Sequence, residues 1–143
     1  MVMQTWFYWA LASAIFAAMT AIFAKMGLQG IDSDFATFIR TLVIIAALSL
    51  FLSYTGKWQS PSSLSAKNWL FLILSGLATG ASWLAYFKAL QLGNASQVAP
   101  VDKFSLVLVA IFAVWFLGEK PSAQEWSGIG LVAAGVLVLA LKR

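Results

Sequence analysis

The chain has 143 residues, of which 62% are hydrophobic and 10% are charged, and its formal net charge is +4. An ordinary soluble domain has about 45–50% apolar and about 25% charged residues, so this composition is typical of a membrane protein. The chain contains no cysteine and no histidine, which excludes disulfides, thiolate or imidazole metal sites, and histidine acid–base chemistry. The basic residues are scattered at the ends of apolar segments, so we expect no nucleic-acid binding. We also expect no cofactor.

Five apolar segments are long enough to cross a bilayer as helices, a crossing that takes about 20 residues. The sequence therefore predicts an all-α integral membrane protein, a bundle of five transmembrane helices forming a single domain over residues 1–143. The first segment has no basic leader and is long enough to span, so we expect it to stay attached to the protein. The predicted helices cover about residues 5–24, 35–54, 69–92, 98–118 and 126–141.

The second predicted helix contains a charged residue well inside its apolar sequence. Asp32, Ser33 and Asp34 mark a turn and a helix cap just before it. Arg40 follows one to two turns later, and the charge-free residues 41–56 are too few to span the bilayer alone. Arg40 must therefore either extend its side chain along the helix to the interface or face a polar cavity.

The third and fourth predicted helices meet at a polar hinge, residues 93–97. Lys88 lies shortly before this hinge, and Asp102 and Lys103 lie in the opening turns of the fourth helix. Pro100 precedes them, at a place where its missing N–H costs little or leaves a kink. The third helix also carries hydroxyl groups at helical spacing, on Ser75, Thr79, Ser82 and Tyr86.

Two interpretations of these polar groups are open. In the first, the charges converge about one turn inside one membrane face and line the mouth of a polar pathway, because ionisable groups at membrane depth are costly. In the second, Lys88 and Lys103 extend to the interface, Asp102 pairs with a neighbour, and Trp83 only packs. The candidate pathway residues are Arg40, Thr79, Ser82, Trp83, Tyr86, Lys88, Asp102 and Lys103.

Glycines recur in two of the predicted helices. Small residues four apart allow the backbones of neighbouring membrane helices to approach closely. The candidate packing glycines are Gly76 and Gly80 in the third helix and Gly128, Gly130 and Gly135 in the fifth.

Several short motifs resemble one known family. They are the Tyr-Phe-Lys-Ala-Leu run at 86–90, the Gly-Asn-Ala-Ser hinge at 93–96, an early-helix proline, Phe-Leu-Gly-Glu at 116–119, and the glycines of the last helix. With five spans, the chain resembles a single EamA-type domain of the drug/metabolite transporter superfamily. The resemblance covers nearly the whole chain and is strongest over residues 76–135. Many members carry two such domains in tandem, which implies that a one-domain chain assembles from at least two copies.

The resemblance implies a transporter for a small polar or amphipathic solute, working as a dimer by alternating access in the plasma (inner) membrane. Members move amino acids, nucleotide sugars, sugars or drugs, and nothing in the sequence selects one substrate. Small multidrug exporters of this superfamily use a glutamate in their first span, and this chain has no acidic residue there. The alternative is an accessory or structural membrane subunit without transport activity. The sequence contains no evident nucleophile–base pair and no metal-binding cluster, so we do not expect an enzyme.

The charge balance leaves the orientation open. An odd number of spans places the termini on opposite sides of the bilayer. The residues clearly outside the spans are balanced, with Lys57, Lys67 and Lys120 on the N-terminal side and Lys25, Lys142 and Arg143 on the other. Such a balance permits insertion both ways and an antiparallel homodimer, whereas the count of all basic residues favours one orientation.

Overall fold

The computed structural model describes residues 5–141, which are helical and contain no strand. Five helical stretches within this range are long and apolar enough to cross a membrane, which confirms the predicted fold class. Lys142 and Arg143, counted above for the C-terminal side, lie outside the described residues. The stretches are α1 (Thr5–Gly27), α2 (Ser33–Thr55), α3 (Ala66–Leu92), the fourth span (Ala95–Leu117) and α6 (Ala123–Ala140).

The helix ends follow local sequence signals. The carboxylate of Asp32 accepts hydrogen bonds from the backbone N–H groups of Asp34 and Phe35, at 2.9 and 3.1 Å, which confirms the predicted cap of α2. Gly56 ends α2 with a φ of 65°, a left-handed conformation that favours glycine. At the start of α6, Ser122 and Glu125 form a reciprocal capping box.

Most large apolar side chains of the described helices are exposed on the chain itself. The buried residues are Ala21, Leu28, Ser33, Thr37, Phe87, Leu90, Ala113 and Val136. A helix that is apolar all round needs lipid or protein around it, because water would not tolerate this much exposed hydrophobic surface. The chain is thus an integral, multi-pass membrane protein.

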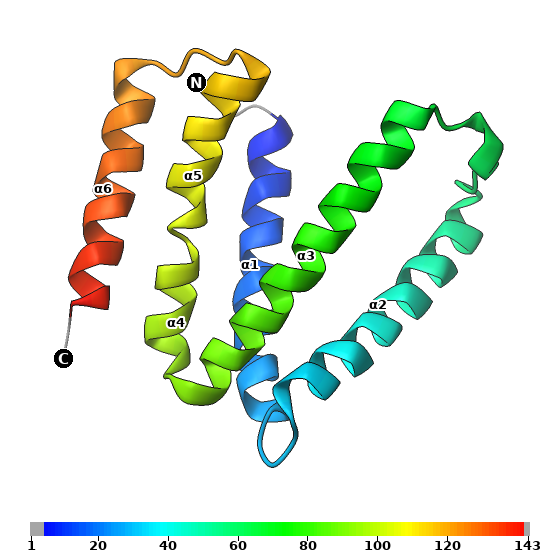
Figure 1. Ribbon diagram of the computed structural model, residues 1–143, viewed down its shortest axis with the longest axis horizontal. Coiled ribbons are helices and arrows are strands. Elements are labelled where there is room, and N and C mark those ends of the chain that lie inside the picture. The colour runs from blue at the N-terminus through cyan, green and yellow to red at the C-terminus, as the bar shows by residue number, and fades with distance from the viewer. Residues whose placement is uncertain (1–4, 142–143) are drawn as a thin grey trace. The chain divides into compact units, whose positions relative to one another are not determined.

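The structure divides into two compact units, which are described separately. The first, here called the hairpin unit, is Phe23–Leu92. Its helices α2 and α3 are joined through a short 3-10 turn, η1 (Pro61–Ser63), and run antiparallel (Figure 1). The second, here called the split-span unit, is Met1–Ile22 with Gly93–Arg143. It contains the pieces of the fourth span, which pack beside α6 (Figure 1).

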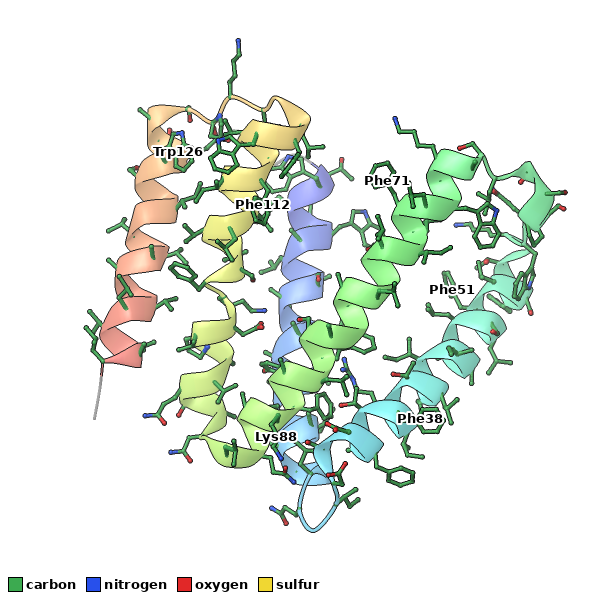
Figure 2. The ribbon with its side chains drawn as sticks, in the orientation of Figure 1. Phe38, Phe51, Phe71, Lys88, Phe112 and Trp126 are labelled. Carbon is green, nitrogen blue, oxygen red and sulfur yellow. The ribbon has the colours of Figure 1, made fainter. Side chains whose placement is uncertain are left out.

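The core of the hairpin unit lies where α2 begins and α3 ends. Leu90 is fully buried there, and Ser33 and Thr37 are buried on the first turns of α2. Two hydrogen bonds link the end of α3 to the chain before α2. The Lys25 ammonium, in the last turn of α1, donates to the carbonyl oxygen of Leu90, and the Gln91 side-chain amide donates to the carbonyl oxygen of Ile31. On the outer side of α2, Phe38 points away from α3 (Figure 2).

The fourth span is broken, where the sequence predicted one helix over residues 98–118. It consists of α4 (Ala95–Asp102), α5 (Ser105–Phe112) and a π-helical turn, η2 (Ala113–Leu117). At the break, the N–H of Lys103 bonds the carbonyl of Pro100 and that of Phe104 bonds Val101, each at 3.0 Å. These bonds span three residues instead of four, so the helix tightens and stops just after Pro100. A proline disturbs the regular ladder because it lacks an N–H and crowds the preceding turn.

Candidate functional site

Arg40 occupies the contact between α2 and α3 in the hairpin unit. Its guanidinium carbon lies 4.2 Å from the ring centroid of Trp83 and 5.2 Å from that of Phe87. Trp83 and Phe87 are four residues apart on α3, so both rings lie on the face that meets α2. Arg40 is half-buried between the helices, and Phe87 is buried. The structure therefore brings Arg40 and Trp83 together, two of the predicted pathway residues.

The position of the guanidinium along α3 argues against an interfacial arginine. Arg40 is the eighth residue of α2, about 10 Å from its start at 1.5 Å per residue. On α3, which ends at Leu92, Trp83 lies deeper than Phe87, about 13 Å against about 8 Å from that end. The guanidinium is closer to the deeper ring. The side chain thus stays at depth and does not extend toward the nearer helix ends.

No carboxylate of the hairpin unit pairs with Arg40. Asp32 caps α2, and Asp34 accepts a hydrogen bond from the Ser33 hydroxyl at 3.3 Å. In the other unit, Lys103 and Asp102 form an ion pair with each other. Arginine at the centre of a membrane helix costs about 2.5–3.5 kcal/mol by insertion scales. Each cation–π contact offsets about 0.5–2 kcal/mol of this cost, so the two rings together compensate for much of it.

The hydroxyl-bearing residues that the sequence places at helical spacing on α3 do not all lie in the same environment. The Thr79 hydroxyl donates to the carbonyl of Ser75 at 2.8 Å, and both Thr79 and Ser82 are exposed on the chain. Tyr86, by contrast, is half-buried and interacts electrostatically with Arg40. Trp83 and Tyr86 thus belong to the Arg40 cluster, whereas Thr79 and Ser82 lie on a surface open to lipid or to another protein.

Two members of the cluster escaped the sequence analysis. Phe87 follows Trp83 by one helical turn on the same face of α3, but it was not among the predicted pathway residues. Thr37 precedes Arg40 by three residues and is buried, with its hydroxyl donating to the carbonyl of Ser33 at 2.9 Å. In both cases the signal was helical spacing from a residue already singled out.

Lys88 is exposed near the end of α3, four residues before Leu92 (Figure 2). This position agrees with a lysine that extends its ammonium toward the membrane interface. Lys88 adjoins Phe87 in the sequence but lies on a different side of α3, because successive helical residues are about 100° apart. Its part in a pathway stays a prediction.

Asp102 and Lys103 lie at the break of the fourth span, in the split-span unit. Their carboxylate and ammonium are 3.4 Å apart, and the two side chains are partly exposed. Asp102 is the eighth residue of a span that begins at Ala95, so the pair lies about two turns inside, deeper than the one turn expected. Convergence of this pair with Arg40 stays a prediction.

The five candidate packing glycines face open space on the chain. A Cβ added at any of them would meet no atom within 4 Å. The helix packing expected at these positions stays a prediction. The glycines are Gly76, Gly80, Gly128, Gly130 and Gly135.

The sequence of the chain matches the EamA-like transporter family over residues 4–141. It is 59% identical over 138 residues to an uncharacterized transporter in the cobO 3′ region of Sinorhizobium sp, covering 96% of this chain and 98% of that protein. It is 34% identical over 85 residues to a probable 4-amino-4-deoxy-L-arabinose-phosphoundecaprenol flippase subunit, ArnE, of Hamiltonella defensa, covering 59% and 75%. It is 23% identical over 136 residues to the uncharacterized transporter YxxF of Bacillus subtilis, covering 94% and 42%. No solved structure gives a significant match.

These matches and the five apolar spans define a membrane transporter. The chain belongs to the EamA-like transporter family, as the motifs of the third to fifth spans predicted. Its relatives are described as transporters and not as enzymes.

Proposed function

We propose that the protein carries a small polar or amphipathic solute across the plasma membrane by alternating access, as a homodimer. The observation that carries this proposal is Arg40, held at membrane depth by Trp83 and Phe87 and without a carboxylate partner in its unit. Intramembrane charges face protein interiors or aqueous cavities and mark substrate or ion pathways. Membrane transport is the function in which such a residue is useful.

The broken fourth span supports the same function. Discontinuous helices near the substrate site are a recurrent feature of transporters, because the freed backbone groups and nearby side chains can serve ions or solutes. Here the break carries Asp102 and Lys103, which form an ion pair. Irregular backbone at membrane depth requires protein or water beside it. In the proposal the pair lies on the solute path.

A second copy of the chain supplies the rest of the path. The match covers only 42% of YxxF, so more than half of that longer transporter lies outside it. The glycines of α3, which have open space beside them, and its exposed hydroxyls provide a surface on which another helix could pack. An antiparallel arrangement of two copies would reproduce the inverted halves of tandem transporters, provided that the chain inserts both ways.

A second candidate function is an accessory subunit, because one relative is named as a flippase subunit. Purified protein in liposomes separates the two. The liposomes are loaded with one unlabelled solute at a time from a panel of amino acids, sugars, nucleotides and organic cations, and uptake of the labelled solute is followed by counterflow. The proposal predicts uptake above protein-free liposomes for at least one solute. Folded, correctly inserted protein that never exceeds this control supports the accessory role.

Native mass spectrometry from detergent tests the assembly directly. The proposal predicts a peak at twice the mass of the chain, and its intensity should fall on dilution. A chain that stays monomeric in native-like lipid and still transports would contradict the dimer while leaving transport intact.

A further inference from the structure

We infer that the guanidinium of Arg40 binds an anionic group, a carboxylate or a phosphate, on the molecule that enters the hairpin unit. The inference rests on the proposed function, because it assigns the chemical class of the transported solute. The structural basis is the arrangement of Arg40, Trp83 and Phe87 at the contact of α2 and α3.

The two rings attract the charge of Arg40 but leave its N–H groups without acceptors. An aromatic ring interacts with a cation through its electron-rich face, and it offers no oxygen lone pairs. Arginine carries five N–H donors in a planar fork, and the structure gives it no hydrogen bond to any of residues 5–141. A carboxylate or a phosphate matches this fork with two parallel hydrogen bonds, which a neutral hydroxyl does not.

The surroundings of Arg40 offer no competing anion within the hairpin unit. Asp32 is used by the α2 cap and Asp34 lies beside it, one and a half to two turns from Arg40 along the helix. The nearby hydroxyls of Thr37 and Thr41 donate to carbonyl oxygens of the preceding turn, at 2.9 and 2.8 Å. Their hydroxyls are thus already engaged by the α2 backbone.

The other cations of this end would draw an anion toward the site. Lys88 is exposed near the end of α3, and Lys25 binds the carbonyl of Leu90 there. Both lie closer to the helix ends than Arg40 does. A positive potential at an entrance raises the local concentration of anions. The arrangement is therefore one cation at depth and two nearer the surface.

Trp83 provides a direct readout, because its ring lies against the guanidinium. We would prepare a chain in which Trp83 is the sole tryptophan and the other six are phenylalanine, checked for folding by gel filtration. Its emission is titrated in phosphatidylcholine nanodiscs with sodium acetate and with sodium phosphate, at constant ionic strength set by chloride. Choline chloride is the cation control. A parallel set of nanodiscs contains phosphatidylglycerol and no added solute, which tests a lipid headgroup as the source of the anion.

The inference predicts a saturable change in Trp83 emission with acetate or phosphate, and none with choline. Arg40→Gln should weaken the apparent affinity at least tenfold, and Arg40→Lys should weaken it less, since it keeps the charge without the fork. Lys67→Gln is the matched control, because it removes one charge from the opposite end of α3 and should change nothing. A response only in phosphatidylglycerol nanodiscs, lost in Arg40→Gln, would identify a lipid headgroup as the bound anion.

Three outcomes would overturn the inference. The first is no saturable response to any anion in either set of nanodiscs. The second is a response equal in parent, Arg40→Gln and Arg40→Lys. The third is a response that appears only in Asp102→Asn, which would show that Asp102 already neutralises Arg40. If Arg40→Gln does not fold, Arg40→Lys carries the comparison. This assay measures binding and not transport. An anion response in a protein that takes up no solute would therefore contradict only the proposed function. Uptake of a cation that is unchanged by substitution of Arg40 would contradict only the anion site.

Discussion

The ammonium of Lys25 donates a hydrogen bond to the backbone carbonyl oxygen of Leu90, a residue 65 positions later in the sequence. Leu90 lies in the last turn of α3, where the final four carbonyl groups of a helix have no partner within it. A cation at that end also interacts favourably with the helix dipole. The bond therefore ties the end of α1 to the end of α3 in the core of the hairpin unit.

Loss of this bond should destabilise the hairpin unit. In Lys25→Met the carbonyl of Leu90 loses a charged donor, at a cost of about 1.5–3 kcal/mol. The measurement is the fraction of protein that remains monodisperse in gel filtration after heating in detergent, and its midpoint should fall by several degrees. Lys57→Met, in the exposed loop after α2, is the control and should keep the parent midpoint. Equal midpoints for both variants would mean that the bond contributes nothing.

The ion pair at the break of the fourth span should be required for transport. In the proposed pathway, Asp102→Asn and Lys103→Met should each reduce the uptake of a transported solute at least tenfold, with the amount of folded protein unchanged. Glu119→Gln makes the same charge change as Asp102→Asn in the exposed connection before α6 and should transport normally. Normal uptake by both pair variants would remove Asp102 and Lys103 from the pathway.

Gly80→Leu should act on assembly and not on the fold of the chain. A Cβ at Gly80 meets open space, and leucine has a better helix propensity than glycine by about 0.8–1 kcal/mol. The monomer should therefore be as stable as the parent. If a second copy packs on this face, the dimer fraction should fall several-fold on native mass spectrometry. Leu77→Ala, on the same helix, is a control for a change in side-chain size. An unchanged dimer would indicate that the Gly80 face contacts lipid.

The capping box should hold the start of α6. Ser122→Ala removes the hydroxyl that accepts from the backbone N–H of Glu125 at 3.3 Å, a loss that typically costs about 0.5–2 kcal/mol. The heating assay in detergent should show a lower midpoint for Ser122→Ala. Ser127→Ala, whose hydroxyl only bonds back to the carbonyl of Gln124, is the control. A drop of the same size in both would point to a general effect of losing hydroxyls in α6.

Orientation can be measured with one added cysteine, because the natural chain has none. A cysteine placed after Arg143 is labelled with a membrane-impermeant maleimide on intact cells and again after lysis. An antiparallel dimer predicts partial labelling on intact cells and completion after lysis. Labelling that is complete or absent before lysis would exclude insertion both ways and leave a parallel dimer.

The sequence predicted the number and type of the spans because long apolar runs have no other stable solution in this short chain. It also located the cap at Asp32, since the capping chemistry is local. It did not predict which rings would hold Arg40, because helical spacing assigns a residue to a face without saying which helix that face meets. The break after Pro100 was foreseen only as a possible kink, because the choice between a kink and a stop depends on the hydrogen bonds of the following turn.

The turn at Lys103 and Phe104 also changes the mechanics of the fourth span. An unbroken helix of 23 residues would tilt as one rod, so movement at one membrane face would be carried to the other. The break divides the span into α4 and α5, each of eight residues, with η2 continuing α5, so a tilt of α4 need not be passed on to α5. A carrier must never be open on both sides at once. In the proposed alternating-access cycle, a joint at this depth would allow one end of the span to move while the other end stays closed.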